Sequence, residues 1–201
     1  MRLILASASP RRAALLTAAG FQFETRPVEV DERPLAGERP TDYVLRIARA
    51  KARAAVRPDP EEAVLAADTA VVIDDLILGK PTDEADAVRM LSLLSGREHQ
   101  VLTGVVIHKG AREASAVEVS LVQFLHLSRR EIASYVASGE PWDKAGAYAV
   151  QGLASRFVSR VTGSCSNVVG LPVARVYRLL EELSGSPASW PPAAVEDRRS
   201  D

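Results

Sequence analysis

The chain has 201 residues, of which 47% are hydrophobic and 25% are charged. This size and composition predict a folded domain with a proper core, and they exclude both a stapled mini-protein and a disordered chain. The net charge of -1 gives no general attraction to nucleic acid or to an anionic membrane. The single cysteine, Cys165, excludes an internal disulfide and fits a reducing compartment. With no signal peptide and no apolar run of about 18 residues, we expect a cytoplasmic protein outside the membrane.

Strand and helix patterns alternate from the N-terminus. Residues 3–6 predict a short buried strand, and Ser9 followed by Pro10 predicts the start of a helix. Thr41 is a candidate cap for a second helix that extends to about residue 56. This alternation is typical of a layered domain in which helices cover a sheet.

The middle and the end of the chain continue the pattern. The apolar run 63–73 predicts a central strand that turns at Asp74 and Asp75. The other predicted elements are a returning strand at 77–79, a helix from Asp83 to about 94, strands at 101–107 and 116–127, a helix that begins at a capping box of Ser128 and Glu131, and a helix at 172–183. We therefore predict one α/β domain of the mixed α+β kind over residues 1–184, followed by a disordered tail at 185–201.

Two arginines occupy an unusual position at the start of the first helix. Arg11 and Arg12 lie in its first turn, where the positive end of the helix dipole disfavours cations. A phosphate bound there would compensate, since it would meet free backbone N–H groups, both guanidiniums and the hydroxyls of Ser7 and Ser9. The alternative is a solvated pair on the surface.

Lys51 and Asp68 are charged residues at positions that predict burial. Lys51 continues the apolar face of the second helix, and Asp68 is the only charge in the run 63–73. A buried carboxylate is costly unless it is paired, hydrated or bound to a metal, so Asp68 is a candidate functional acid. The hairpin can return Lys80 to its vicinity, and Thr69 should point to the opposite face of the strand. A snorkelling lysine and a satisfied core carboxylate are the alternatives.

A stretch of small and hydrogen-bonding residues from Glu140 to Asn167 suggests a backbone that a ligand approaches closely. An irregular loop is the alternative. The three histidines lack metal-ligand spacing, and no Ser-His-Asp order or Cys-His pair is found, which argues against zinc and acyl-enzyme chemistry.

Taken together, the ordered motifs of residues 1 to about 184 resemble the Maf family of nucleoside triphosphate pyrophosphatases. The matching segments are SASPRR at 7–12, DE at 31–32, ARAKA at 48–52, ADTAV at 67–71, GKP at 79–81, GREHQVLTGV at 96–105, DKAGAY at 143–148, VQG at 150–152 and NVVGLP at 167–172. The resemblance implies a mixed sheet in two lobes around a nucleotide cleft, similar to the inosine triphosphate pyrophosphatase fold, and a homodimer. It also implies hydrolysis between the α and β phosphates, aided by Mg²⁺ or Mn²⁺.

The resemblance assigns roles to the same residues. It implies that Asp68 is the proton acceptor and that Arg12, Thr69 and Gln151 set base specificity. The pair of Gln151 and Gly152 favours the dTTP and UTP branch over the 7-methyl-GTP branch. Cys165 is a departure, because a tyrosine is common there in the family.

Phosphoryl-transfer chemistry completes the set of candidates. The catalytic candidates are Asp68, Lys51 and Lys80, and the phosphate-binding candidates are Ser7, Ser9, Arg11 and Arg12. Glu32 and Asp68 are the candidate metal ligands.

Three alternatives remain open at this point. The first is a 7-methyl-GTP pyrophosphatase, and the second is a nucleotide-binding regulator of cell division at the septum. The third is a nucleic-acid-binding module that uses the arginines at 46, 49, 53 and 57, although the net charge argues against it.

Overall fold

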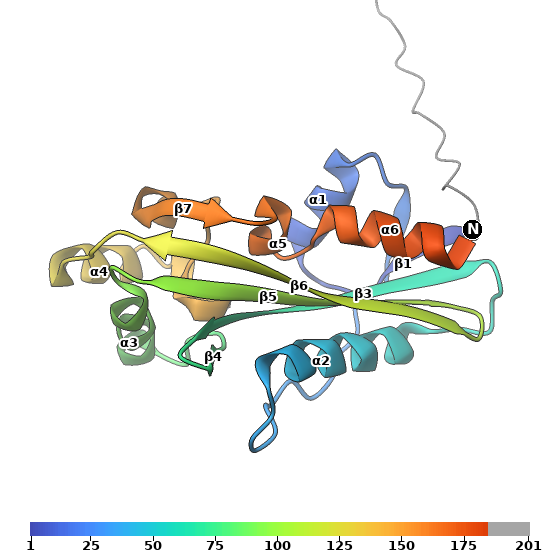
Figure 1. The fold of residues 1–201 in the computed structure, drawn as a ribbon, viewed down its shortest axis with the longest axis horizontal. Coiled ribbons are helices and arrows are strands. Elements are labelled where there is room, and N and C mark those ends of the chain that lie inside the picture. The colour runs from blue at the N-terminus through green and yellow to red at the C-terminus, as the bar shows by residue number, and fades with distance from the viewer. Residues whose placement is uncertain (185–201) are drawn as a thin grey trace, which may run out of the picture.

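The computed structural model describes residues 1–184, and Figure 1 shows their arrangement. In chain order the elements are β1 (Arg2–Leu5), α1 (Pro10–Ala18), β2 (Phe23–Thr25), α2 (Pro40–Ala55), β3 (Glu62–Ile73), β4 (Leu76–Leu78), α3 (Glu84–Leu94), β5 (Glu98–Lys109), β6 (Arg112–Phe124), α4 (Arg129–Val136), the 3₁₀ helices η1 (Glu140–Asp143), η2 (Ala145–Ala147) and η3 (Leu153–Phe157), β7 (Val158–Thr162), α5 (Cys165–Val169) and α6 (Val173–Ser184). The predicted tail at 185–201 lies outside the described residues.

The strands form one mixed sheet in the order β2-β1-β3-β5-β6-β7, and β4 pairs with β3 beside this path. β1 runs parallel to β2 and β3, whereas the pairs from β3 through β7 are antiparallel. α2 covers one face of the sheet, α1, α5 and α6 cover the other, and α3 and α4 lie at one end (Figure 1). This arrangement confirms the expected mixed α/β class.

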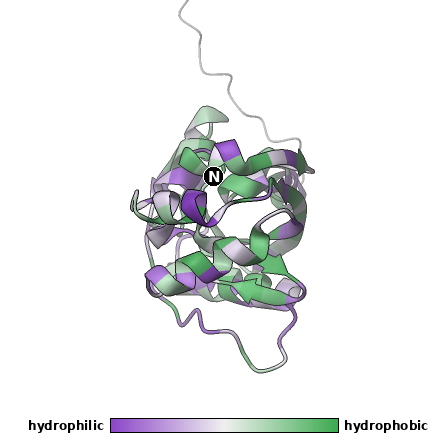
Figure 2. Ribbon diagram, turned by 90° about the vertical axis from the view of Figure 1, so that its left-hand side faces the viewer, coloured by the Kyte–Doolittle hydropathy of each residue, from purple (hydrophilic) through white to green (hydrophobic). Residues whose placement is uncertain are grey.

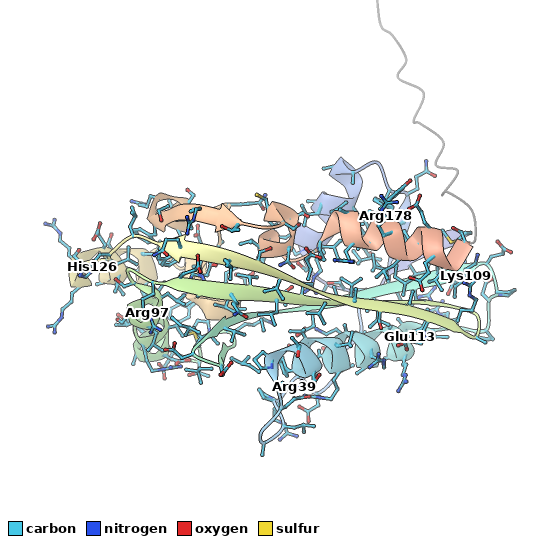
Figure 3. All side chains as sticks on the ribbon, viewed as in Figure 1. Arg39, Arg97, Lys109, Glu113, His126 and Arg178 are labelled. Carbon is cyan, nitrogen blue, oxygen red and sulfur yellow. The ribbon has the colours of Figure 1, made fainter. Side chains whose placement is uncertain are left out.

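β3 forms the centre of the core. Every residue of this strand except Thr69 is buried, because helices cover both faces of the sheet at this point. The covering helices carry both hydrophobic and hydrophilic residues (Figure 2), and α2 buries Val44, Ile47 and Ala48 against the sheet. Charged side chains such as Arg97, Lys109 and Arg178 lie at the periphery (Figure 3).

A close contact between α2 and β5 brings the predicted charges together. Gly104 of β5 is the cross-strand partner of Asp68, and a Cβ atom there would lie 2.5 Å from the carbonyl oxygen of Val44. Only glycine lets the helix backbone approach the sheet this closely. Lys51 lies two turns further along the same face of α2, so it is held against the sheet beside Asp68.

Several local predictions are confirmed. Asp74 and Asp75 form the turn between β3 and β4 with positive φ angles of 49° and 61°. Asp83 caps α3 by accepting a hydrogen bond from the N–H group of Asp86, and the capping box of Ser128 with Glu131 begins α4. Lys51 is buried on the apolar face of α2, as its spacing predicts.

The prediction that Thr41 caps α2 is wrong. The helix begins at Pro40 after Arg39, because proline fits the first helical position, where its missing N–H group has no intrahelical partner to lose. Ser9 precedes α1 as expected, but its side chain makes no capping bond. Its own N–H group donates to Oγ of Ser7 at 3.1 Å. The first turn of α1 therefore has no side-chain cap.

The sequence patterns do not predict six short elements, namely β2, β7, α5, η1, η2 and η3. Each has only three to five residues, too few for a periodicity to show. Within residues 1–184, no helix has the length and apolar character needed to cross a membrane.

Candidate active site

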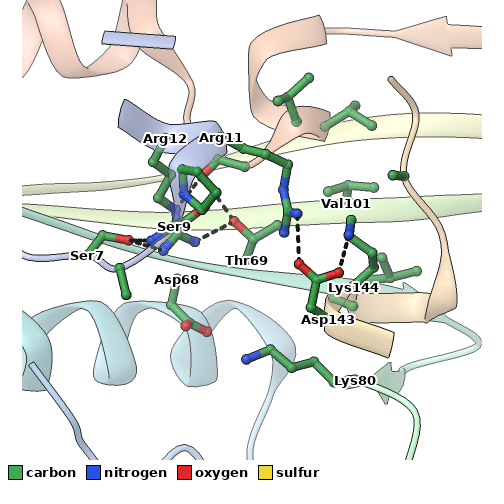
Figure 4. A pocket seen from close by; sticks show the side chains of 18 of the residues that line it. Ser7, Ser9, Arg11, Arg12, Asp68, Thr69, Lys80, Val101, Asp143 and Lys144 are labelled. Atoms are coloured by element: carbon green, nitrogen blue, oxygen red, sulfur yellow. Dashed lines mark hydrogen bonds and ion pairs between the residues drawn. The ribbon is translucent and has the colours of Figure 1, made fainter. Parts of the chain in front are cut away.

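A cleft of about 390 Å³ lies where the start of α1, the middle of β3 and the 143–151 segment meet (Figure 4). This volume is within the usual range for small-molecule sites. The cleft brings together all the sequence-predicted site residues, namely Ser7, Ser9, Arg11, Arg12, Glu32, Lys51, Asp68, Thr69, Lys80 and Gln151. They come from segments that span most of the chain, so the fold assembles the site.

The start of α1 forms one wall of the cleft. The Arg12 guanidinium is held by three protein acceptors: Nε donates to the carbonyl of Gly170 (2.8 Å), Nη2 to Oγ1 of Thr69 (3.1 Å) and Nη1 to Oγ of Ser7 (3.4 Å). Burial lowers the pKa of Arg12. Since α1 also has no side-chain cap and no acidic residue in its first turn, this wall is electropositive.

Lys51 joins two carboxylates on the opposite wall. Its Nζ atom lies 2.7 Å from Oδ1 of Asp68 and 2.6 Å from Oε1 of Glu32. Asp68 and Lys51 are only 6% and 8% exposed, so the low local dielectric strengthens their attraction. The alternative in which Lys51 extends its ammonium group to the surface is wrong, because this group forms ion pairs with both carboxylates inside the cleft.

The two carboxyl groups differ in their surroundings. Burial raises the pKa of Asp68 above its ordinary value, and the charge of Lys51 only partly opposes this effect. Burial also acts on Glu32, but the hydrogen bond and the charge of Lys51 outweigh it and hold the pKa of Glu32 below its ordinary value. Burial therefore makes Asp68 a stronger base than an ordinary aspartate, whereas Lys51 makes Glu32 a weaker base than an ordinary glutamate.

Lys80 approaches this cluster from the turn after β4. Figure 4 shows its amine pointing toward Asp68, as the hairpin prediction expects. The turn is anchored by a hydrogen bond from the N–H group of Gly146 to the carbonyl of Gly79 (3.0 Å). Thr69 points to the other face of β3, as predicted, where its hydroxyl lies 2.9 Å from that of Thr103.

An ion pair joins the start of α1 to the 143–151 segment, which forms the third wall of the cleft. Nη1 of Arg11 lies 3.1 Å from Oδ2 of Asp143, and Asp143 also contacts Lys144 (Figure 4). The sequence placed Asp143 and Lys144 in a ligand-binding stretch but assigned them no role. Arg11, a predicted phosphate-binding residue, thus forms an ion pair with a carboxylate in this structure.

Apolar residues line the cleft next to Gln151. Val71, Val101 and Tyr148 belong to one core cluster, and Val168 and Val150, which precedes Gln151, pack against it. The hydroxyl of Tyr148 pairs with Nε2 of His99 at 2.8 Å, and burial lowers the pKa of His99 to about 4, so this histidine is neutral. The sequence does not predict this pair, because His99 and Tyr148 are 49 residues apart and no local pattern links them. Cys165 is exposed and is not among the residues that line the cleft.

The donor set of the cleft fits a magnesium ion that is bound mainly through a substrate. Within residues 1–184 no group of three or more His, Cys, Asp or Glu residues converges to form a metal cluster. Glu32 and Asp68, however, each have one carboxylate oxygen without a hydrogen-bond partner among these residues. Mg²⁺ is commonly held by one or two carboxylates together with substrate phosphates and water.

The arginines of α2 form a less basic surface than their number suggests. Arg46 pairs with Glu38 at 2.6 Å, and Arg49 pairs with Glu113 at 2.8 Å. These ion pairs neutralise part of the patch on which the nucleic-acid alternative depends.

Comparison with known proteins places the chain in a family. The model of the family described as Maf-like protein matches residues 2–183. A relative from Anaeromyxobacter dehalogenans, named dTTP/UTP pyrophosphatase, is 53% identical over 193 residues, which cover 94% of this chain and 97% of the relative. A relative of the same name from Koribacter versatilis is 50% identical and covers 90% of this chain and 93% of its own length. The chain therefore belongs to the Maf family.

The fold is similar to that of the Ham1 protein of Staphylococcus aureus. The TM-score is 0.53 at 12% identity, and the match covers 91% of this chain and all of that protein. At this identity the likeness concerns the fold alone. It agrees with the expected architecture of a mixed sheet with flanking helices.

Proposed function

We propose that this protein hydrolyses dTTP and UTP to the nucleoside monophosphate and pyrophosphate. One observation carries the proposal: the buried Asp68, paired with Lys51, faces the electropositive start of α1 in a single cleft. The proposal is supported by curated relatives named dTTP/UTP pyrophosphatase at about 50% identity over most of the chain.

The polarity of the cleft sets the direction of the bound nucleotide. The triphosphate lies between the start of α1 and the lysines Lys51 and Lys80, where cations and uncapped N–H groups neutralise its charge. The base lies at the apolar end near Tyr148 and Gln151. The α-phosphate is then next to Asp68.

Asp68 is the residue that accepts a proton from the attacking water. Its raised pKa makes it a better base than an ordinary aspartate, and Lys51 keeps its carboxylate oriented. Lys80 and the arginines of α1 stabilise the charge that moves to the leaving pyrophosphate. Glu32 and Asp68 would hold Mg²⁺ or Mn²⁺, which supplies charge neutralisation at the phosphates when it is bound.

Gln151 is the residue that recognises the base. Its NH₂ group can donate to O4 of uracil or thymine, and its carbonyl oxygen can accept from N3–H of the same base. The Gln151 side chain has no hydrogen bond within residues 1–184. Arg12 and Thr69 complete the specificity set. We also propose that the protein is a homodimer, as the family resemblance implies. The single cysteine fits a location in the cytoplasm.

Product analysis with dTTP, UTP, CTP and 7-methyl-GTP in the presence of Mg²⁺ tests this function. We expect dTTP and UTP to give monophosphate and pyrophosphate at the highest kcat/KM. Release of orthophosphate would show that a different bond is cut. Preference for 7-methyl-GTP would instead assign the other branch, and nucleotide binding without any turnover would favour a regulator.

A further inference from the structure

The carboxylate of Glu140 binds the backbone just after Gln151, on the side of the segment that faces away from the cleft. Glu140, at the start of η1, accepts a hydrogen bond from the N–H group of Leu153 at Oε2 (2.8 Å). Its Oε1 accepts from the N–H group of Ala154 (3.3 Å) and from the hydroxyl of the buried Tyr135 (2.8 Å). These two N–H groups open η3, so Glu140 caps this short helix from a distant position in the chain.

Gly152 is shaped to accept this carboxylate. Its φ of -111° is available to any residue, so backbone conformation does not explain the glycine. A Cβ atom at this position would lie 2.2 Å from Oε2 and 2.4 Å from Cδ of Glu140. The carboxylate therefore occupies the space that a side chain at 152 would need, directly beside the backbone of Gln151.

Apolar packing also holds this segment, because Tyr148, Ala154 and Phe157 are buried in the core and Val150 packs against it. The backbone hydrogen bonds that flank Gln151, by contrast, are local. The N–H group of Gly152 donates to the carbonyl of Ala149 (3.1 Å), which closes a turn, and that of Ser155 donates to the carbonyl of Gly152 (3.0 Å). Both contacts are local, and the Gln151 side chain has no hydrogen bond within residues 1–184. The three bonds to Glu140 join the segment to α4 and η1.

We propose that Glu140 is a positioning residue for base recognition, whose carboxylate fixes the place at which Gln151 enters the cleft. The proposal rests on the proposed role of Gln151 in reading the base. Glu140 is half-buried on the far side of Gly152 and does not line the cleft, so it acts through the segment and not on the substrate. Residue 152 must then be a glycine, because any side chain there would overlap the Glu140 carboxylate.

The main test substitutes Glu140→Gln and measures kcat/KM for UTP and for CTP. The amide has one acceptor oxygen for the three donors, and its NH₂ group would face a backbone N–H group, so the segment must shift. We expect the UTP to CTP ratio to fall about three- to tenfold, the value of roughly one hydrogen bond. A purely structural role would lower kcat/KM for both nucleotides equally and leave the ratio unchanged.

A double-mutant cycle with Gln151→Ala separates this proposal from the proposed function. Gln151→Ala should lower the ratio, and adding Glu140→Gln should lower it no further. If Gln151→Ala leaves the ratio unchanged, the role of Gln151 is wrong and the positioning role falls with it. If Gln151→Ala lowers the ratio but Glu140→Gln does not, the positioning role alone is overturned.

Two further variants keep the test decisive. Glu131→Gln is the matched control, because Glu131 also accepts a backbone N–H bond at a helix start but lies outside the cleft, so it should leave the ratio unchanged.

Gly152→Ala places a methyl group where the Glu140 carboxylate lies, so it should displace the carboxylate and lower the ratio even where Glu140→Gln does not fold. Faster hydrogen exchange at the amides of Leu153 and Ala154 is expected in both site variants, and unchanged exchange would contradict the proposal.

Discussion

Asp68→Asn is expected to lower kcat for UTP by about 10²- to 10⁴-fold, the usual effect of losing a catalytic acid or base. The substitution keeps the size of the side chain and removes its charge. Nucleotide binding should be affected much less, because the cations at the start of α1 and Lys80 remain. The measurement is kcat together with nucleotide affinity and thermal stability for both proteins.

The control for this variant is Asp75→Asn at the exposed turn of the same hairpin, which should retain wild-type activity. A folded Asp68→Asn protein with kcat within a few fold of wild type would show that Asp68 is a structural carboxylate. Added Mn²⁺ should recover part of the activity if the loss arises through metal binding, whereas loss of a proton acceptor alone should show no recovery.

Lys51→Met should reduce both activity and stability. It leaves the buried Asp68 without its ion pair, and breaking a buried pair from one side costs about 3 kcal/mol or more. We also expect the pKa of Asp68 to rise further, because Lys51 is the main charge that opposes the effect of burial. The variant should therefore have lower kcat/KM than the wild type, and its activity should fall at a higher pH than the wild type's when the pH is lowered.

Arg53→Met on the exposed face of α2 is the matched control, since it removes a cation of the same helix that has no role in the cleft. The double variant Lys51→Met, Asp68→Asn should be more stable than Lys51→Met, because it removes the unpaired charge along with its partner. Equal stability of Lys51→Met and Arg53→Met in denaturant unfolding would contradict the buried ion pair.

The site residues that could be predicted are those whose charge conflicts with their local pattern. Asp68 interrupts an apolar strand and Lys51 interrupts the apolar face of a helix, so each is costly unless the fold provides a partner. The sequence does not reveal that they are partners of each other. That pairing depends on the close approach of α2 to Gly104, which is a feature of tertiary packing.

Other parts of the site have no such signal. Glu140 begins the stretch of small and hydrogen-bonding residues, but the sequence does not indicate its contact with Gly152, which follows from the way η1 and η3 fold together. The His99–Tyr148 pair likewise joins β5 to a distant loop. Among the elements, long periodic helices and capped termini were predictable, whereas the start of α2 at Pro40 was missed because Thr41 is the stronger capping residue.

The most direct test of the account is UTP hydrolysis in water enriched in oxygen-18, with mass spectrometry of both products. In the proposed reaction, water attacks the α-phosphorus next to Asp68 and pyrophosphate is the leaving group. The label should therefore appear in the phosphate of UMP, and the pyrophosphate should carry none. Label in the pyrophosphate, or labelled orthophosphate as the main product, would contradict the account.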